Sequence, residues 1–569
     1  MPNAATITVP ETLALLDGQF ASVARAVAED RYVLWLGSGI SFGRVDGLRQ
    51  VIARVLEFLR VRTIPGDPAC RFGRALRAAL ELAPITPEEE ARVDLTQPFA
   101  TWPDSNHIVV RLCNNYARLL DINVQGESED YLLWEAVELR ATFADPAKPP
   151  DVEHLCLAML VLEGACSDLA SANWDGLIES AVTTMTGGQP ALSVCARPED
   201  LRNPALRGRL IKFHGCAVLA THNEAAYRPF LVARQSQING WISRPENAAV
   251  RGRLVDLVAT KPTLMIGLSA QDANIQALFA QAAVQMPWRW PGNPPSYVFS
   301  ANELGGDQQG LLQIVYRQDM TPGNRQQIID EARIQAYAKP LLLALVLHLL
   351  CSKIRALVDL APGAIPVADR QSLRDGVIAL RNFVAASVAP DPLSFINVFI
   401  DQWGRSLHLI RNGSLTHATG RYQPLTVESI ANIGANPGLP ASGLRETAVA
   451  AGLIGYGVSR GEWQIDTPAS NAVRDGMFRL HAPSGGVKVF FTSGPISAMQ
   501  LKQDGHLVDA DEAIVIHGHK LIPAMARSPR AAPGRTGRRE VREVSLATLL
   551  ESSATLDELF QKFRMELAI

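Results

Sequence analysis

The sequence predicts an α/β fold built on a doubly wound parallel sheet, with a helical insertion and a mixed α/β region after it. Short apolar segments, of the kind that are buried on both faces of a sheet, alternate with helical patterns from residue 31 to about residue 320. Several of these segments end in Gly, Asn, His or Ser. A chain of 569 residues is too long for one hydrophobic core, so we expect roughly two to four domains.

The stretch 31–41 organises the first domain. Residues 32–36 read Tyr-Val-Leu-Trp-Leu, which suits a fully buried strand. Gly37 and Gly39 follow and allow a sharp turn, and apolar residues then recur at helical spacing over 48–59. A strand, a glycine turn and a helix form the unit with which α/β folds hold a pyrophosphate, although the complete Gly-x-Gly-x-x-Gly pattern is missing here.

The other elements of the first domain follow in order. We expect strands at residues 168–172, 210–215 and 263–268, with two further candidates at 297–299 and 312–316. Helical patterns occupy residues 12–29, 152–163, 225–241, 248–259 and 272–283, and another helix follows residue 177. Strands that alternate with helices in this way form a Rossmann-like sheet.

Changes in the pattern of expected helices and strands divide the chain into three parts. Residues 1–330 form the first domain, with a mainly helical insertion at about 72–150. Residues 331–400 are a helical connector, and residues 401–569 are a C-terminal region of mixed character. Within the C-terminal region, strands are expected at 487–491 and 513–517 and a last helix at 555–567.

Composition indicates a globular cytoplasmic protein that does not enter the membrane. The net charge of -3 gives no general argument for a polyanionic partner. The N-terminus contains Glu11 and Asp17 and lacks the pattern of a secretory signal. The longest apolar run, 341–351, has about half the length that a bilayer requires and is interpreted as a core helix. The seven cysteines form no Cys-x-x-Cys pair, so we expect buried free thiols and no zinc site.

Polar residues and glycines gather where the predicted core strands end. Gly37, Gly39 and Ser41 follow the first strand, Asn173 and Asp175 the second, His214 the third, and Gly267, Ser269, Asp272 and Asn274 the fourth. The carboxyl ends of parallel strands share one edge of a sheet, and ligands bind at that edge. The sequence therefore predicts a ligand site formed by four strand ends.

Each of these residues also has an ordinary structural interpretation. Asn173 and Asp175 could cap the helix that follows them, and Ser269 and Asp272 could cap the next one. His214 could be a core histidine with satisfied hydrogen bonds. The joint pattern, with every group at a strand end, favours a nucleotide site.

Four segments resemble motifs of sirtuin-like, NAD-consuming proteins, in the order of that family. Gly-Ser-Gly-Ile-Ser at 37–41 resembles the family's Gly-Ala-Gly-Ile-Ser, and Ala-Asn-Trp-Asp at 172–175 resembles its Thr-Asn-Tyr-Asp. Lys-Phe-His-Gly at 212–215 resembles Lys-Leu-His-Gly. Residues 266–275 resemble the Gly-Tyr-Ser-x-x-Asp-x-Asn-Ile block of the bacterial defence branch. The resemblance covers about 31–275 and says nothing about residues after about 330.

The resemblance implies a role for each matching residue. Gly37, Ser38, Gly39 and Ser41 would hold the pyrophosphate of NAD, and Gly267, Ser269, Asp272 and Asn274 would line the adenosine side. Asn173 would face the nicotinamide ribose and position a water, Asp175 would fix the ribose or the Asn173 loop, and His214 would be the general base. Histidine and asparagine suit the roles of His214 and Asn173, because imidazole titrates near neutral pH and an amide binds a hydroxyl and a water without bringing a charge.

The chain departs from the family pattern at three points. Ser38 replaces an alanine, Trp174 replaces a smaller residue, and 42–48 replaces the usual Gly-Ile-Pro continuation. In that loop, Arg44 and Asp46 could contact the ligand, but a solvated loop is the favoured interpretation.

The cysteine pattern separates two kinds of NAD chemistry. Sirtuin-like deacylases carry a four-cysteine zinc module, whereas Cys195 and Cys216 are the only cysteines between Asn173 and Ser269. The resemblance therefore implies an NAD glycohydrolase that releases nicotinamide and ADP-ribose. It would act as the toxic, NAD-depleting effector of an anti-phage, abortive-infection system. It would form a homo-oligomer, with a tetramer as the expected state, and its C-terminal region would sense a partner protein or a signalling nucleotide.

Two alternatives stay open from the sequence. The site could bind NAD or ADP-ribose as a regulatory ligand without turnover. The chain could instead belong to a short-Argonaute-type complex, with the arginine-rich segment 527–542 on nucleic acid, although an exposed loop is favoured there. His517 and His519 could bind a metal, but with no obvious third ligand they are interpreted as surface histidines.

Overall fold

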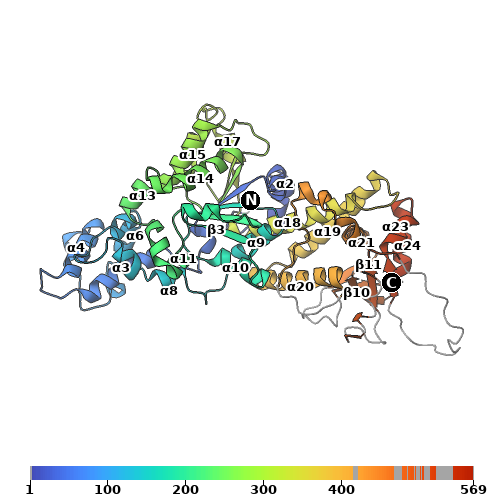
Figure 1. Ribbon diagram of the computed structural model, residues 1–569, viewed down its shortest axis with the longest axis horizontal. Coiled ribbons are helices and arrows are strands. Elements are labelled where there is room, and N and C mark those ends of the chain that lie inside the picture. The colour runs from blue at the N-terminus through green and yellow to red at the C-terminus, as the bar shows by residue number, and fades with distance from the viewer. Residues whose placement is uncertain are drawn as a thin grey trace.

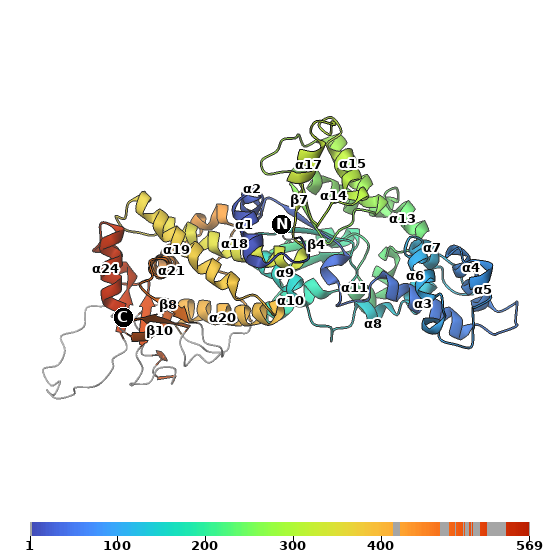
Figure 2. The ribbon, with the colours of Figure 1, turned by 180° about the vertical axis from the view of Figure 1, so that it is seen from behind.

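The computed structural model describes residues 3–413, 421–466, 477–483, 485–492, 494, 500–501, 503–504, 513–520 and 542–567. The molecule is elongated, with a helical insertion at one end, a parallel sheet in the middle and the C-terminal region at the other end (Figure 1). Seen from behind, α20 (Pro392–Asn412) runs from the central part towards the C-terminal sheet (Figure 2).

The central sheet has seven parallel strands in the order β3-β4-β2-β1-β5-β6-β7. The strands are β1 (Val33–Leu36), β2 (Asp168–Ser171), β3 (Leu192–Cys195), β4 (Gly208–Lys212), β5 (Thr263–Ile266), β6 (Tyr297–Ser300) and β7 (Arg333–Ile334). Strands β2, β3 and β4 lie on one side of β1, and the chain then returns to place β5, β6 and β7 on the other side. This reversal confirms the doubly wound, Rossmann-like sheet and makes β1 its switch point.

The strand β1 is buried on both faces because its side chains alternate between two cores. Leu34 and Leu36 belong to the core that also contains α9 (Val152–Leu162). Val33 and Trp35 belong to the core on the opposite face. The Trp35 ring packs there against Phe279, with ring centroids 4.9 Å apart. A continuous apolar strand is what a central position in a parallel sheet requires.

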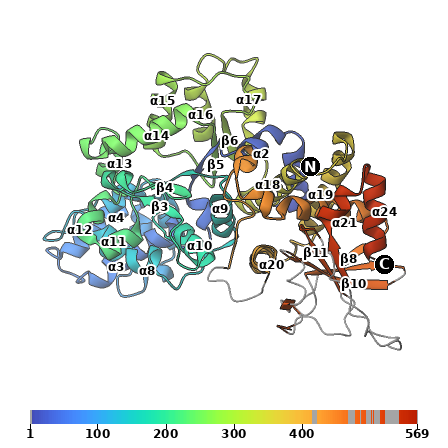
Figure 3. The same cartoon turned by 45° about the vertical axis from the view of Figure 1, so that its right-hand side comes forward.

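Helices cover both faces of this sheet. They are α1 (Val9–Asp17), α2 (Ala21–Ala28), α9, α10 (Leu177–Thr186), α13 (Gln235–Trp241), α14 (Ala248–Thr260), α15 (Ala273–Gln285), α16 (Gly306–Val315) and α17 (Arg325–Glu331). Two short helices after β4, α11 (Ala217–His222) and α12 (Glu224–Tyr227), lie beside the helical insertion. The helix α9 lies between α10 and α18 (Ala338–Asp359) in the middle of the molecule (Figure 3).

Three predictions of secondary structure need correction. The candidate strand at 312–316 lies mostly in α16, because Leu311, Leu312 and Val315 form the buried face of a helix. The expected helix at 12–29 is divided near Gly18 into α1 and α2. The expected helix at 225–241 is likewise interrupted and becomes α12 and α13.

The helical insertion has a hydrophobic core of its own. It begins before the expected boundary near residue 72, because α3 (Leu48–Arg62) packs in this core. Its other elements are α4 (Arg71–Leu82), α5 (Pro87–Glu90), α6 (Ser105–Cys113), α7 (Tyr116–Leu120), a π-helix (Leu132–Ala136) and α8 (Leu139–Phe143). Leu56, Leu76 and Leu112 are buried together there, and Ala217 of α11 joins the same core. The insertion therefore packs directly against a segment that follows β4.

The C-terminal region combines helices with a mixed sheet in the order β12-β11-β10-β9-β8. Its helices after α18 are α19 (Val367–Ala386), α20, α21 (Leu444–Ser459), α23 (Leu546–Glu551) and α24 (Leu556–Leu567). The strands are β8 (Gln464–Asp466), β9 (Phe478–Ala482), β10 (Gly485–Thr492), β11 (Ala513–His517) and β12 (Arg542–Ser545). Strands β10, β11 and β12 are parallel, whereas β8 and β9 pair antiparallel. The arginine-rich segment lies outside the described residues, apart from Arg542 at the start of β12.

The helix α18 is longer and more apolar than the run expected at 341–351. By length and composition alone it could cross a membrane, but 72% of its apolar window is buried inside the protein. Burial of that kind is typical of a core helix, as the sequence predicts.

Candidate functional site

The sheet order brings the four predicted groups of residues to one edge. Strands β4, β2, β1 and β5 are consecutive neighbours, and each is followed by one of the groups. Since β1 is the switch point, its carboxyl end opens where the connections diverge to the two sides. The candidate site is therefore centred on the turn after β1.

The turn after β1 packs backbone to backbone against the turn after β5. The Gly39 N–H donates to the Gly267 carbonyl at 3.1 Å, and the Gly37 N–H donates to the Ile266 carbonyl at 3.0 Å. A methyl group on Gly37 would lie 2.3 Å from the Gly267 oxygen. Gly267 itself has φ near +64°, a conformation that favours glycine. The glycines thus serve the contact between two turns, while Ser38 stays exposed beside them.

Substitution of Gly37 by alanine is expected to lower the free energy of unfolding by about 2–3 kcal/mol, because the new methyl group meets fixed backbone. Gly37 has φ near -108°, so the cost is steric and not conformational. Urea denaturation measures it. Gly310→Ala is the matched control, since Gly310 lies in α16 facing open space, and we expect it to be neutral or stabilising. Equal stability of Gly37→Ala and wild type would contradict the tight contact.

Asn173 is tied to the turn after β1 by its side chain. Its Nδ2 donates to the Gly37 carbonyl at 3.1 Å, and its backbone N–H donates to Ser171 Oγ at 3.0 Å. The Ser171 hydroxyl in turn donates to the Leu36 carbonyl at 3.2 Å. The amide of Asn173 is half-buried and held next to the glycine turn.

Asp175, Ser41 and His154 form a buried polar chain beneath the site. Ser41 Oγ lies 3.0 Å from Asp175 Oδ2 and 3.1 Å from His154 Nε2. The Asp151 N–H donates to His154 Nδ1 at 3.1 Å, so the ring proton belongs on Nε2. Nε2–H then donates to Ser41, and the Ser41 hydroxyl donates to Asp175. Asp175 Oδ1 also accepts the Leu177 N–H at 3.2 Å, so the helix-capping interpretation of this residue holds as well.

The sequence reasoning missed His154 and assigned Ser41 to the pyrophosphate. The structure buries the Ser41 hydroxyl and directs it to Asp175 instead of to the exposed surface of the turn. The spacing Asp151-x-x-His154 at the start of an apolar helix is a capping-box pattern, which could have indicated the local contact. No local pattern indicates that His154 reaches Ser41.

Acidification is expected to destabilise the wild-type protein more than the His154→Gln variant. Burial lowers the pKa of His154 from 6.5 to about 4 in the folded protein, against the opposing charge of Asp175. The unfolded state therefore binds the extra proton between these values. The stabilising contribution is complete above pH 6.5 and is lost as the pH falls towards 4. At about 1.36 kcal/mol per pKa unit, the loss is roughly 3 kcal/mol.

Urea denaturation over this pH range tests the expectation. The exposed His107, changed to Gln, serves as the control and should follow the wild-type curve. If the His154→Gln curve also runs parallel to the wild-type curve, the buried neutral histidine is refuted.

The buried Lys212 side chain also contacts the Asn173–Asp175 segment. Its buried Nζ donates to the Asp175 carbonyl oxygen and to Glu179 Oε1, the latter at 2.7 Å. Burial acts to lower the pKa of Lys212, but the nearby Glu179 carboxylate helps to raise it above its usual range. A permanently charged lysine therefore holds the backbone of the Asn173–Asp175 segment.

His214 stands next to Asp272 at the site edge. Its Nε2 lies 3.0 Å from Asp272 Oδ2, within ion-pair distance but without hydrogen-bond geometry, and the His214 side chain is almost buried. Asp272 Oδ1 accepts the Asn274 N–H at 2.8 Å, so Asp272 caps α15 as the structural interpretation expects. Burial raises the pKa of Asp272, but the His214 imidazole outweighs it and the pKa is lowered. A carboxylate beside an imidazole orients a general base and stabilises its protonated form.

Asn274 supplies a buried donor without a protein acceptor. Its side chain is almost fully buried, and among the described residues its Nδ2 has no hydrogen-bond partner. A donor of this kind at the site edge can be satisfied by a ligand or by a water molecule. Ser269 lies in the same turn and is exposed.

The loop at 42–48, which departs from the family pattern, is held by ion pairs within the protein. In the loop after the first turn, Arg44 pairs with Asp151 at 3.0 Å and Asp46 pairs with Arg54. Both charges thus make ion pairs within the protein, whereas the neighbouring Phe42 side chain is exposed.

Trp174 connects the site to the helical insertion. Its Nε1 donates to the His214 carbonyl at 3.0 Å, and its ring packs edge-on against Phe143 of α8 at 5.4 Å. The larger residue therefore braces the ends of β2 and β4 against the insertion.

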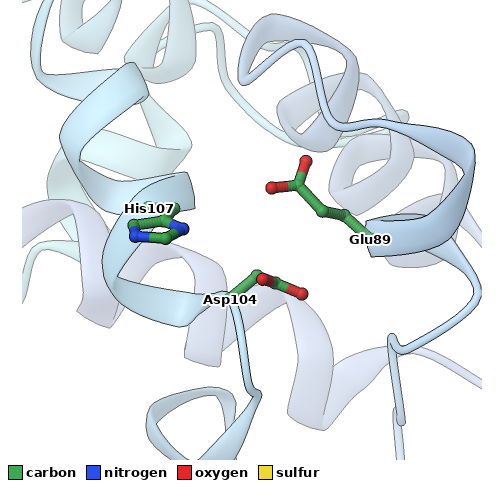
Figure 4. Close-up of side chains that lie close together, drawn as sticks. All are labelled: Glu89, Asp104 and His107. Carbon is green, nitrogen blue, oxygen red and sulfur yellow. The ribbon is translucent and has the colours of Figure 1, made fainter.

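One group in the insertion has the residue types of a metal site. Glu89, Asp104 and His107 lie close together (Figure 4). Arg111 already holds Glu89 through contacts of 2.7 and 2.9 Å, and Arg92 holds Asp104 at 2.7 Å. These arginines neutralise the carboxylates, so the group carries no argument for a bound ion.

One family model matches part of the chain. Residues 168–319 match the SIR2-like domain, a range that begins with β2 and ends after α16. The match contains Asn173, Asp175, His214 and the turn at 267–274, but not the glycine turn at 37–41. No curated protein matches the chain. Domains of this family bind NAD and are in general NAD-dependent enzymes, so the match supports a sirtuin-like sheet with an NAD-related function.

Proposed function

We propose that the protein is an NAD glycohydrolase that cleaves NAD to nicotinamide and ADP-ribose. One observation carries the proposal. At the switch point of a SIR2-like sheet, Asn173 follows β2, and the His214–Asp272 pair joins the ends of β4 and β5, with the unsatisfied buried amide of Asn274 in the same turn as Asp272. Together they form a polar edge suited to a ribose and a water molecule.

In the proposed reaction the protein forms no covalent bond with the substrate. The bond between the ribose C1′ and the nicotinamide nitrogen breaks, and its electron pair leaves with the ring as neutral nicotinamide. Water attacks C1′, on which positive charge develops, and His214 accepts the proton of that water. Asn173 holds the ribose and the water in place, and Asp272 stabilises the imidazolium that forms. Orientation and exclusion of bulk water supply most of the acceleration.

The cysteine pattern favours hydrolysis over deacylation. Cys195 and Cys216 are buried free thiols at separate places, and Cys216 contacts Lys212. They leave no set of four ligands between Asn173 and Ser269 for the zinc module that supports an acyl-lysine cleft.

The wider role we propose is that of a toxic effector in anti-phage defence, controlled through the C-terminal region and assembled as a homo-oligomer. One feature supports control from that side. The residue after α9, Glu163, is bound by Lys353 of α18 at 2.8 Å and by Tyr422 at 2.6 Å. At its start, α9 carries His154, which contacts Ser41 beneath the site. A single buried helix thus joins the C-terminal region to the catalytic edge.

Release of nicotinamide from NAD by the purified protein tests the proposal, alone and with extract from infected cells. We expect release that requires or is increased by the extract. Tight binding of NAD without release under both conditions would contradict a hydrolase and favour a regulatory NAD-binding module.

A further inference from the structure

The helix α9 is buried along its whole length and still carries a histidine that reaches the candidate site. Every residue from Val152 to Leu162 is buried. Nine of these positions are apolar and Glu153 pairs with Lys339, whereas His154 makes specific polar contacts through both ring nitrogens. An apolar residue would fill the same space without the cost of burying an imidazole.

We infer that His154 is a positioning residue for the proposed NAD cleavage, acting through Ser41 on Asp175 and thereby on the loop that carries Asn173. This inference rests on the proposed function. It adds to it a residue that lies outside the four strand-end groups and outside the SIR2-like match, which begins at residue 168.

The direction of the hydrogen bonds carries the argument. The Asp151 N–H occupies His154 Nδ1 and so leaves a proton on Nε2. Because Nε2–H donates to Ser41 Oγ, the single Ser41 proton points to Asp175 Oδ2. A backbone group at the start of α9 thus determines the orientation of a hydroxyl beneath the site.

Asp175 accepts three hydrogen bonds, one of which comes from the Ser41 hydroxyl. Its Oδ2 accepts from Ser41, its Oδ1 accepts the Leu177 N–H, and its backbone carbonyl accepts from Lys212. Asn173 lies two residues earlier, with its own amide on the Gly37 carbonyl. The short segment between them has little freedom while these contacts persist, and precise placement of a reacting group is worth large factors in rate.

Two substitutions of His154 separate positioning from packing. His154→Gln keeps a side-chain N–H near the place of Nε2, whereas His154→Leu fills the space without a donor. We expect His154→Leu to lower kcat about 10- to 100-fold with little change in KM, as for other residues that orient a reacting group. The glutamine variant should recover most of kcat. Ser41→Ala should resemble His154→Leu, and Ser41→Thr, which keeps the hydroxyl, should retain activity.

Leu157→Ala provides the matched control for stability. Leu157 is also fully buried on α9, and its truncation is expected to cost about 2–5 kcal/mol of unfolding free energy. Below its melting temperature this variant should keep the wild-type kcat, because it leaves the polar chain intact. Nicotinamide release gives kcat and KM, and the ¹⁵N shifts of the His154 ring report whether Nε2 carries the proton.

The outcomes are distinct. A reduced kcat in His154→Leu and Ser41→Ala, with recovery in His154→Gln, supports the inference. Wild-type kcat in folded His154→Leu overturns it while the proposed function stands. An Nδ1-protonated ring also overturns it, because the chain would then run the other way. If wild-type protein releases no nicotinamide, the proposed function fails and the role of His154 falls with it.

Discussion

Alanine at Asn173 or at His214 is expected to reduce NAD cleavage by about 100-fold or more. Asn173 lies beside the glycine turn at the switch point, where the ribose of NAD would be held, and its loss removes the group that orders the attacking water. His214 is paired with Asp272 at 3.0 Å and is the base in the proposed reaction. Without it, the proton of the attacking water has no acceptor of suitable basicity. Nicotinamide release under saturating NAD measures both effects.

Two further measurements make this result specific. His222→Ala removes an exposed histidine of α11, eight residues from His214, and should leave the rate unchanged. Thermal unfolding should show that the Asn173 and His214 variants remain folded, since Asn173 is half-buried and His214 lies at the end of the sheet. Wild-type rates in both variants would remove the proposed site from the reaction.

Methionine at Lys353 is expected to lower the free energy of unfolding by about 3–5 kcal/mol. Lys353 and Glu163 are both fully buried, with Nζ 2.8 Å from Oε2. Lys353 also donates to the carbonyl oxygens of Glu163 and Thr426. Burial lowers the pKa of Lys353 despite the neighbouring Glu163 carboxylate. The substitution would leave that carboxylate in the interior without its cation, which is the costly outcome for a buried ion pair.

A double variant tests the cause of this loss. Replacing both Lys353 and Glu163 by methionine removes the uncompensated charge and should recover much of the stability, although Tyr422 and the Leu425 N–H then lose their acceptor. The partly exposed pair of Glu558 and Lys562 on α24 is the control. Its removal should cost less than about 1 kcal/mol in the same urea experiment. A similar loss at both pairs would contradict the special role of the buried one.

Local patterns were sufficient for the strands and helices that matter most to the site. The expected strands at 32–36, 168–172, 210–215 and 263–268 correspond to β1, β2, β4 and β5. Each is a short apolar run followed by glycine or polar residues, and such a run is determined by nearest neighbours in the chain. Predictions failed where a helix was divided, or where an apolar run could be either element, as at α16.

Less of the C-terminal region could be predicted. The long helix α20 carries Phe395, Phe399 and Trp403 at helical spacing, yet the predicted helical connector ends at residue 400, inside this helix. Strands β3 and β7 of the central sheet were also missed. They are short and lie at the two ends of the strand order, where partial burial weakens the apolar signal.

The sequence by itself determined the class of the fold, the strand ends that carry Gly37, Asn173, His214 and Gly267, and the resemblance that joins them. All of these depend on residues that are close together in the chain. Only the tertiary structure decided that β1 is the switch point, that Asp272 meets His214, and that His154 reaches Asp175 through Ser41. Those contacts join residues far apart in sequence, and they depend on how the whole sheet and α9 pack, which no local pattern specifies.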